Sequence, residues 1–192
     1  MSLERTRMAK RVGLSGLVVA ALWATPAAAQ TGGSAAPGSV PPAPAANSGI
    51  PGQATIAADG RALAPPDAPR AVRKAINAGN KIRRKPYRWG GGHARWKDKG
   101  YDCSGAVSYV LHAAGLLKTP MPSGPLARQW GSAGVGQWIT VYANGGHVYA
   151  VIAGLRWDTS AVGEPVNQGS GPRWRSTARS PAGYTARYAL GL

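Results

Sequence analysis

The amino-acid sequence predicts an α+β domain in which helices come first and an antiparallel β-sheet follows. Two segments between residues 69 and 114 carry apolar side chains at helical spacing. From residue 138 onward, short segments rich in β-forming residues alternate with glycine-containing turns. Helices followed by a run of strands are the pattern of an α+β fold.

The 192-residue chain begins with the pattern of a secretory signal peptide. Basic residues occur within positions 5–11, an apolar run covers residues 12–24, and small residues lie at 26–29. A retained membrane anchor is the alternative, but the run is shorter than the roughly 20 residues that a membrane span needs. We therefore expect residues 1–29 to be removed on export, which leaves no stable membrane span.

Residues 30–68 are predicted to be a disordered linker. Of these 39 residues, 27 are Ala, Pro, Gly or Ser. Such a composition buries too little apolar surface to offset the entropy of ordering the chain. The folded domain is therefore expected over residues 69–192, a length that suits one hydrophobic core.

The first helix is expected from Pro69 to Ile82. Asp67 is the expected cap of this helix, because a carboxylate accepts hydrogen bonds from the free N–H groups of a first turn. One stripe of the helix predicts the face that packs against the core; it carries Val72, Ala75 with Ile76, and Ile82.

The second helix has the clearest signals in the chain. Asp102 is a favourable N-cap, and Gly115 is a favourable residue just beyond the C-terminal end. Between them, apolar residues repeat at three- and four-residue spacing, as one face of an α-helix requires. These residues are Cys103, Ala106, Val107, Val110, Leu111 and Ala114.

The strands are expected to follow a Pro- and Gly-rich loop over residues 119–125. Asn144-Gly145-Gly146 predicts a tight turn between two of them. Together the strands are expected to form an antiparallel meander. The expected segments are 138–142, 147–153 and 156–160, with weaker candidates at 171–174 and 184–190.

Composition limits the kinds of site that the chain can build. It has one Cys, three His, 23 Lys+Arg and 7 Asp+Glu, which give a formal charge of +16. One Cys excludes an intramolecular disulfide and a zinc site with several thiolates. We expect no metal and no cofactor. The positive charge suggests an anionic partner, but nucleic acid is disfavoured because the chain is expected to be exported and shows no recognised binding motif.

Cys103 is the candidate nucleophile. It lies in the first turn of the second helix, where backbone N–H groups and the helix dipole favour a negative charge. The alternative is a small buried apolar residue, as most unpaired cysteines are. A free thiol in an exported protein is at risk of oxidation. Its presence despite that risk favours the functional interpretation.

A nucleophilic thiol needs a base, and the base needs an orienting group. His147 opens a strand after a tight turn and is favoured over His93, which lies in a Gly-rich loop that it could instead hold together. His112 is nine residues after Cys103, so it points to the opposite side of the helix. Asp158 is the candidate orienting group. It shares a face with His147 only if the intervening hairpin loop has an even number of residues.

Three motifs resemble the NlpC-type family of bacterial cell-wall peptidases. They are Lys85-Pro-Tyr-Arg-Trp-Gly-Gly91, Tyr101-Asp-Cys-Ser-Gly-Ala-Val107 and Gly146-His-Val148. The resemblance implies a papain-like α+β fold with the nucleophile at a helix start. It implies that Cys103 is the nucleophile and His147 the base.

The same resemblance extends to residues around the nucleophile. Tyr87 would lie beside it and help to polarise the carbonyl, and Asp102 and Ser104 would flank it where some members bind the amino end of the substrate. One departure concerns the third member of the triad. In the family it is often a His or another polar residue about a dozen positions after the base, whereas here Asp158 lies eleven positions after it.

The sequence predicts a secreted, monomeric protein with a nucleophilic cysteine. The resemblance implies that it is an endopeptidase that hydrolyses amide bonds in peptidoglycan stem peptides, in the cell wall or periplasm. The charge of the expected domain, 18 basic against 4 acidic residues, suits an anionic wall. An amidase or acyltransferase on the same scaffold is one alternative. A non-catalytic wall-binding module is another, in which exposed tryptophans would contact the wall; the candidates are Trp89, Trp96, Trp130 and Trp174.

Overall fold

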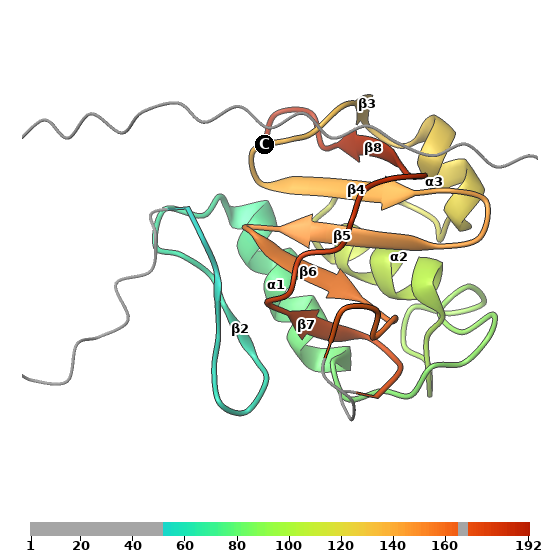
Figure 1. Cartoon of the computed structure of the whole chain (residues 1–192), viewed down its shortest axis with the longest axis horizontal. Helices are drawn as coiled ribbons and strands as arrows, with labels where there is room; N and C mark the ends of the chain where they lie inside the picture. Colours follow the sequence, from blue (N-terminus) through green and yellow to red (C-terminus); the bar gives the residue numbers. More distant parts are fainter. Residues whose placement is uncertain (1–51, 165–168) are drawn as a thin grey trace, which may run out of the picture. The chain divides into compact units, whose positions relative to one another are not determined.

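The computed structural model describes residues 52–164 and 169–192 (Figure 1). The predicted signal peptide and the first part of the predicted linker lie outside these residues. Within them, no helix combines the length and the apolar character that a membrane crossing requires. The elements are β1 (Thr55–Ile56), β2 (Ala62–Leu63), α1 (Arg70–Ile82), α2 (Cys103–Ala113), α3 (Ser123–Gln129), β3 (Ser132–Ala133), β4 (Ile139–Ala143), β5 (Val148–Ile152), β6 (Leu155–Asp158), β7 (Arg173–Arg175) and β8 (Thr185–Tyr188).

The main sheet has six strands in the order β3-β8-β4-β5-β6-β7, and every neighbouring pair is antiparallel. Strands β4 to β7 form the predicted meander. Strand β8 returns to pair with the free side of β4, and the segment that leads to it crosses the face of the sheet opposite the helices (Figure 1). The α+β prediction, with helices before an antiparallel sheet, is confirmed.

The core lies between this sheet and helices α1 and α2. Alternate residues of β4 and β5 point to this side, as the pleat requires. Trp157 of β6 is fully buried, and its indole N–H donates to the carbonyl of Ala106 in α2 at 3.0 Å. The inward residues of β4 and β5 are Ile139, Val141, Ala143, Val148, Ala150 and Ile152, none more than 1% exposed.

Helix α1 buries the predicted stripe, but its predicted cap is wrong. Val72, Ala75 and Ile82 are buried. Pro69 occupies the N-cap position, and no side chain caps the helix. Asp67 is exposed because Ala68 and Pro69 separate it from the first helical turn.

The linker prediction is wrong over residues 54–68. This segment contains the β1–β2 hairpin, and Ala54, Ala62 and Ala68 are buried in the core. The side chain of Asn80 in α1 accepts from the N–H of Ala62 and donates to its carbonyl, both at 2.8 Å. The small alanine side chains allow the hairpin to lie close to α1. Asn80 then supplies hydrogen bonds to the backbone N–H and carbonyl of Ala62, which composition alone predicts to remain in water.

Helix α3 begins inside the predicted loop over residues 119–125. Pro122 is its N-cap residue and Pro125 lies in its first turn, where the missing N–H of proline removes no helical hydrogen bond. Strand β3 is only two residues long, so no alternation of side chains could have predicted it.

Two of the four tryptophans predicted to be exposed are buried. Trp130 is 5% exposed and Trp174 is 6% exposed. Each satisfies its indole N–H inside the protein, Trp130 on the carbonyl of Leu116 and Trp174 on the side chain of Asn80. Trp89 is 86% exposed, whereas the ring of Trp96 stacks on His112 with 3.9 Å between centroids.

Candidate active site

Cys103 is the first residue of α2 and a free, half-buried cysteine. Asp102 is the N-cap, as predicted, and its carboxylate accepts from the N–H of Gly105 at 2.7 Å. Gly115, just beyond the helix, has a φ of +82°, which L side chains rarely adopt. Local sequence signals therefore place the thiol at a helix N-terminus, where the N–H of Cys103 has no acceptor within the helix.

His147 and Asp158 lie side by side although they come from different strands. His147 Nε2 is 2.9 Å from Asp158 Oδ1. The turn between β5 and β6 contains only Ala153 and Gly154, both with positive φ. A two-residue turn of this kind suits the twist of an antiparallel hairpin, and its even length places Asp158 on the face of the sheet that carries His147.

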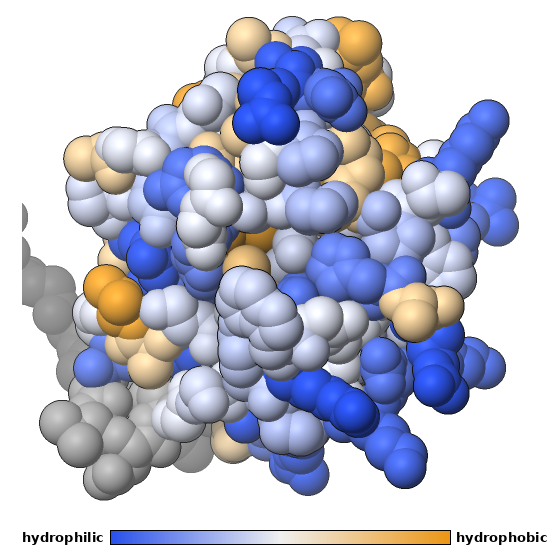
Figure 2. Space-filling model, turned by 90° about the vertical axis from the view of Figure 1, so that its right-hand side faces the viewer, coloured by the Kyte–Doolittle hydropathy of each residue, from blue (hydrophilic) through white to orange (hydrophobic). Residues whose placement is uncertain are grey.

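The position of His147 is set by the turn that precedes it. The side chain of Asn144 accepts from the N–H groups of Gly146 and His147, both at 2.9 Å. Figure 2 views the molecule from the side that is on the right of Figure 1, where this β4–β5 turn lies, and hydrophilic residues cover most of that face. The imidazole itself is 20% exposed, so solvent reaches its edge.

The surroundings of His147 favour its charged form. Burial opposes the charge, but hydrogen bonds with Asp158 and Cys103 and the negative charges of these two residues outweigh it and raise the pKa of His147 to about 9. Because Nε2 faces Asp158, the other ring nitrogen, Nδ1, is the one available to Cys103. The imidazole is therefore hydrogen-bonded to the carboxylate on one side and has its other nitrogen free for the nearby thiol.

Asp158 is held by more groups than His147. Its side chain is completely buried, Arg179 donates to Oδ2 at 3.1 Å, and the N–H of Ser160 donates to Oδ1 at 2.9 Å. Burial works against its charge, yet the hydrogen bonds from His147 and Ser160 and the nearby cations keep the pKa of Asp158 below its usual value. Nε of Arg156 lies 3.7 Å from Oδ2 of Asp158 and adds a further positive charge beside it.

Sequence reasoning missed Arg179. Its guanidinium donates to Asp158 and to the hydroxyl of Tyr184, the latter at 2.8 Å, and lies over the rings of Tyr149 and Tyr184. It is 21 residues from Asp158, in the segment that crosses the sheet before β8. No spacing rule connects such positions, so no sequence signal could have found the pair.

His93 fastens the Gly-rich loop to the start of α2. His93 Nε2 lies 3.1 Å from Asp102 Oδ1 and 3.0 Å from Ser104 Oγ. The N–H of Gly90 in the same loop donates to the other oxygen of Asp102 at 3.0 Å. Asp102 and Ser104, both predicted to flank the nucleophile, therefore also hold this loop.

Tyr87 is brought beside the thiol by a short backbone pairing. It bridges to Tyr101, two residues before Cys103. Partial burial and the negative charges of Cys103 and Asp102 raise the pKa of Tyr87, so its hydroxyl stays protonated and able to donate. His112, by contrast, stacks on Trp96 and contacts the carbonyl of Leu117.

The arrangement suits nucleophilic catalysis by a thiol. A half-buried thiol at a helix start, an imidazole beside it and a buried carboxylate behind the imidazole are the groups that such catalysis requires. Over the described ranges, 52–164 and 169–192, no group of three His, Cys, Asp or Glu side chains could hold a metal ion.

Comparisons with known proteins give structural neighbours only. Neither the protein-family models nor the curated proteins match the sequence. Among solved structures, the chain is similar to Rv1477, a hypothetical invasion protein of Mycobacterium tuberculosis, with a TM-score of 0.43 and 24% identity. It is also similar to the Resuscitation Promoting Factor Interacting protein RipA, in forms mutated at single positions, with TM-scores of 0.43 and 0.41 and identities of 24% and 23%.

Each of these matches covers 62% of this chain and 62% of the other chain. The matched region thus spans less than two thirds of these neighbours.

Proposed function

We propose that this chain is an exported cysteine endopeptidase that hydrolyses amide bonds in the stem peptides of peptidoglycan. The observation that carries the proposal is the hydrogen bond between His147 and the buried carboxylate of Asp158, with Cys103 close enough to the same imidazole to help raise its pKa. A structural cysteine at the edge of a core has no need of an imidazole beside it, nor of a carboxylate fixed by several donors behind that imidazole.

The reaction follows from this geometry. His147 takes the proton of Cys103, and the thiolate attacks the amide carbonyl. The N–H of Cys103 and the hydroxyl of Tyr87 donate to the oxyanion. When the tetrahedral intermediate collapses, His147 gives its proton to the leaving amine, and a thioester remains on Cys103. Water, deprotonated by His147, then attacks the thioester and releases the acid, with the proton returned to Cys103.

Two features support the wall as the substrate. The motifs around Tyr87, Cys103 and His147 resemble the NlpC-type cell-wall peptidases. The excess of basic residues, 23 against 7 acidic in the whole chain, favours accumulation on an anionic polymer through screened, salt-sensitive attraction. Export to the wall or periplasm is part of the same proposal.

The test is digestion of purified peptidoglycan by the purified protein and by the Cys103→Ala variant, with the released fragments read by mass spectrometry. The wild type should release fragments with new free amines, and the masses of these fragments identify the amide that is cut. Cys103→Ala should release none. A wall left unchanged by the wild type would contradict the proposal, as would equal release by Cys103→Ala.

Histidine variants identify the base. His147→Ala should abolish turnover, since no other imidazole reaches Cys103 and Asp158. His112→Ala is the matched control, because His112 lies on the far side of α2, and it should digest the wall at the wild-type rate. If His93→Ala abolished turnover while His147→Ala preserved it, the assignment of His147 would be wrong.

A further inference from the structure

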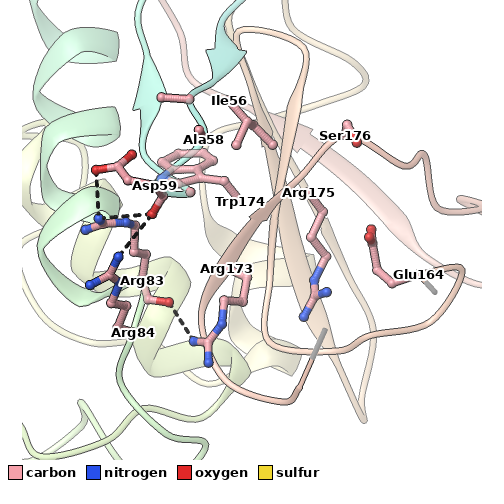
Figure 3. Close-up of a pocket in the computed structure, with 12 residues that line it drawn as sticks. Ile56, Ala58, Asp59, Arg83, Arg84, Glu164, Arg173, Trp174, Arg175 and Ser176 are labelled. Atoms are coloured by element: carbon pink, nitrogen blue, oxygen red, sulfur yellow. Dashed lines mark hydrogen bonds and ion pairs between the residues drawn. The ribbon is translucent and has the colours of Figure 1, made fainter. Parts of the chain in front are cut away.

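A cavity of about 380 Å³, which we name the arginine pocket, lies among four parts of the chain that are distant in sequence (Figure 3). These parts are the end of β1 with the turn that follows it, the residues just beyond α1, Glu164 and the strand β7. Neither the thiol nor its two partners line this cavity, so it is separate from the candidate active site. The charged residues that line it are Arg83, Arg84, Arg173, Arg175, Asp59 and Glu164.

The charges of the arginine pocket do not balance. Four arginines face two acids, an excess of two positive charges. Asp59 pairs with Arg83 at 3.3 Å, whereas Glu164 pairs with Arg156, which is outside the lining, at 3.0 Å. Among the residues that the structure describes, the other three arginines of the pocket have no carboxylate partner.

Arg175 adds a buried positive charge to the lining of the pocket. It is only 2% exposed, and its Nε and Nη1 have no hydrogen-bond acceptor within the described part of the chain. Its Nη2 donates to the carbonyl of Gly169 at 3.3 Å. Burial disfavours the charge of this guanidinium and lowers the pKa of Arg175, although the negative charges of Asp158 and Glu164 act in the opposite direction.

Arg173 and Arg84 are held in place at the rim of the pocket. Arg173 Nη1 donates to the carbonyl of Arg83 at 2.6 Å, and Arg84 Nη2 donates to the carbonyl of Asp59 at 3.3 Å. Both contacts are to neutral carbonyl oxygens, so the positive charges remain available. Planar guanidinium groups fixed in this way match the oxygens of a phosphate or carboxylate.

The other walls of the arginine pocket are apolar. The ring of Trp174 and the side chain of Ile56 line it beside the arginines (Figure 3). Its volume lies within the range of about 300–1,000 Å³ that is usual for small-molecule sites. The cavity therefore has room for an organic group attached to the anion.

We propose that the arginine pocket binds a small organic phosphate monoester. A phosphate dianion matches the excess of two positive charges and offers three terminal oxygens to several guanidinium groups, whereas a carboxylate offers one charge and two oxygens. The ester group lies against Trp174 and Ile56. This binding is independent of the thiol chemistry of Cys103 and goes beyond the proposed peptidase function.

Calorimetric titration of the purified protein tests the proposal, with inorganic phosphate and glycerol phosphate as probes at constant ionic strength. Both should bind saturably, and glycerol phosphate more tightly. Arg84→Gln and Arg173→Gln should each weaken binding about tenfold, the effect of losing one charge-assisted hydrogen bond. Lys74→Gln, which removes a cation from the exposed side of α1, should bind as the wild type does, and so should Cys103→Ala.

Several results would overturn the proposal. Heats from phosphate that match those from chloride would exclude a site, and an equal loss in Lys74→Gln would mean that only net charge matters. If acetate bound as tightly as phosphate, the pocket would not be selective for phosphate. If glycerol phosphate bound no better than inorganic phosphate, the proposed contact with an ester group would be wrong. Arg175→Lys should also weaken binding; if this buried variant fails to fold, the two rim variants decide the question.

Discussion

At the scale of single residues, Asp158 decides the charge of His147. The imidazole is 20% exposed, whereas the carboxylate is completely buried and fixed by Arg179 and Ser160. A carboxylate that cannot turn away keeps one ring nitrogen of His147 occupied and the other directed to the thiol. This contact, together with the nearby thiol of Cys103, raises the pKa of His147 to about 9, so the imidazole is largely protonated at neutral pH, as the proposed proton donation to a leaving amine requires.

Asp158→Asn should lower kcat/KM roughly a hundredfold at neutral pH, because general acid catalysis by His147 loses its orienting charge. The wild-type rate should decline as the pH rises through about 9, where His147 loses its proton. In the variant this decline should begin at lower pH, because the charge that raises the pKa of His147 is gone. Initial rates measured across a pH series give both quantities.

The control for this prediction is Asp67→Asn, which removes an exposed carboxylate remote from the site and should leave the pH profile unchanged. Stability gives a second readout. Since the folded-state pKa of His147 is raised from 6.5, its contribution to stability is fully present below pH 6.5 and disappears as the pH rises through about 9. An unshifted pH profile in Asp158→Asn would contradict the role of this carboxylate.

At the scale of elements, the start of α2 depends on close packing of the Gly-rich loop. A Cβ on Gly105 would lie 2.0 Å from the carbonyl oxygen of Gly91, and one on Gly91 would lie 2.3 Å from that of Gly100. The same carbonyl of Gly91 accepts from the N–H of Asp102 at 3.2 Å. These glycines therefore let the loop that carries His93 lie directly against the helix that carries Cys103.

Gly105→Ala should destabilise the protein and displace this loop. Alanine favours a helix over glycine by about 1 kcal/mol, but the obstacle is backbone, which cannot rotate away, and overpacking costs about 1–3 kcal/mol. We expect a net loss of stability in urea denaturation and a fall in kcat/KM. Gly145→Ala is the matched control, since its Cβ would meet nothing within 4 Å; an equal loss in both variants would contradict the packing argument.

At the scale of the whole described unit, Asn80 joins the hairpin, the first helix and the edge of the sheet. Its amide bonds both backbone groups of Ala62 in β2, and its oxygen also accepts from the indole of Trp174 in β7 at 3.0 Å. Asn80 is 9% exposed. One buried side chain thus satisfies polar groups from two separate segments. Because the hairpin forms one wall of the arginine pocket, Asn80 also helps to hold that wall in place.

Asn80→Ala should lower the free energy of unfolding by about 2–4 kcal/mol, because it leaves two backbone groups and one indole N–H buried without partners. Urea denaturation measures this loss. Asn77→Ala, on the exposed side of the same helix, should change stability by less than about 0.5 kcal/mol. Similar losses in the two variants would show that helix propensity, and not the buried network, is responsible.

Three predictions failed because they were made from the composition or spacing of one segment, whereas contacts with other segments decided two of the outcomes. The linker prediction failed over residues 54–68 because composition counts large apolar side chains, while this hairpin is held by small alanines and one distant asparagine. The predicted cap Asp67 failed because Pro69 occupies the N-cap position instead. The exposure of Trp130 and Trp174 could not be judged either, since their partners lie 14 and 94 residues away.

Local signals were sufficient to predict helix α2 and the place of Cys103 at its start, because capping and helical periodicity act within a few residues. The sequence also limited the partners of that thiol to a few candidates and indicated which hairpin-loop lengths would bring Asp158 to the side of His147. The packing of distant segments was needed to show that His147 lies near Cys103 and that His93 holds the Gly-rich loop. It was also needed to show that Arg179 contacts Asp158 and that the arginines around β7 surround a cavity. These relations depend on strand register and on packing between segments far apart in the chain, which no local pattern of residues encodes.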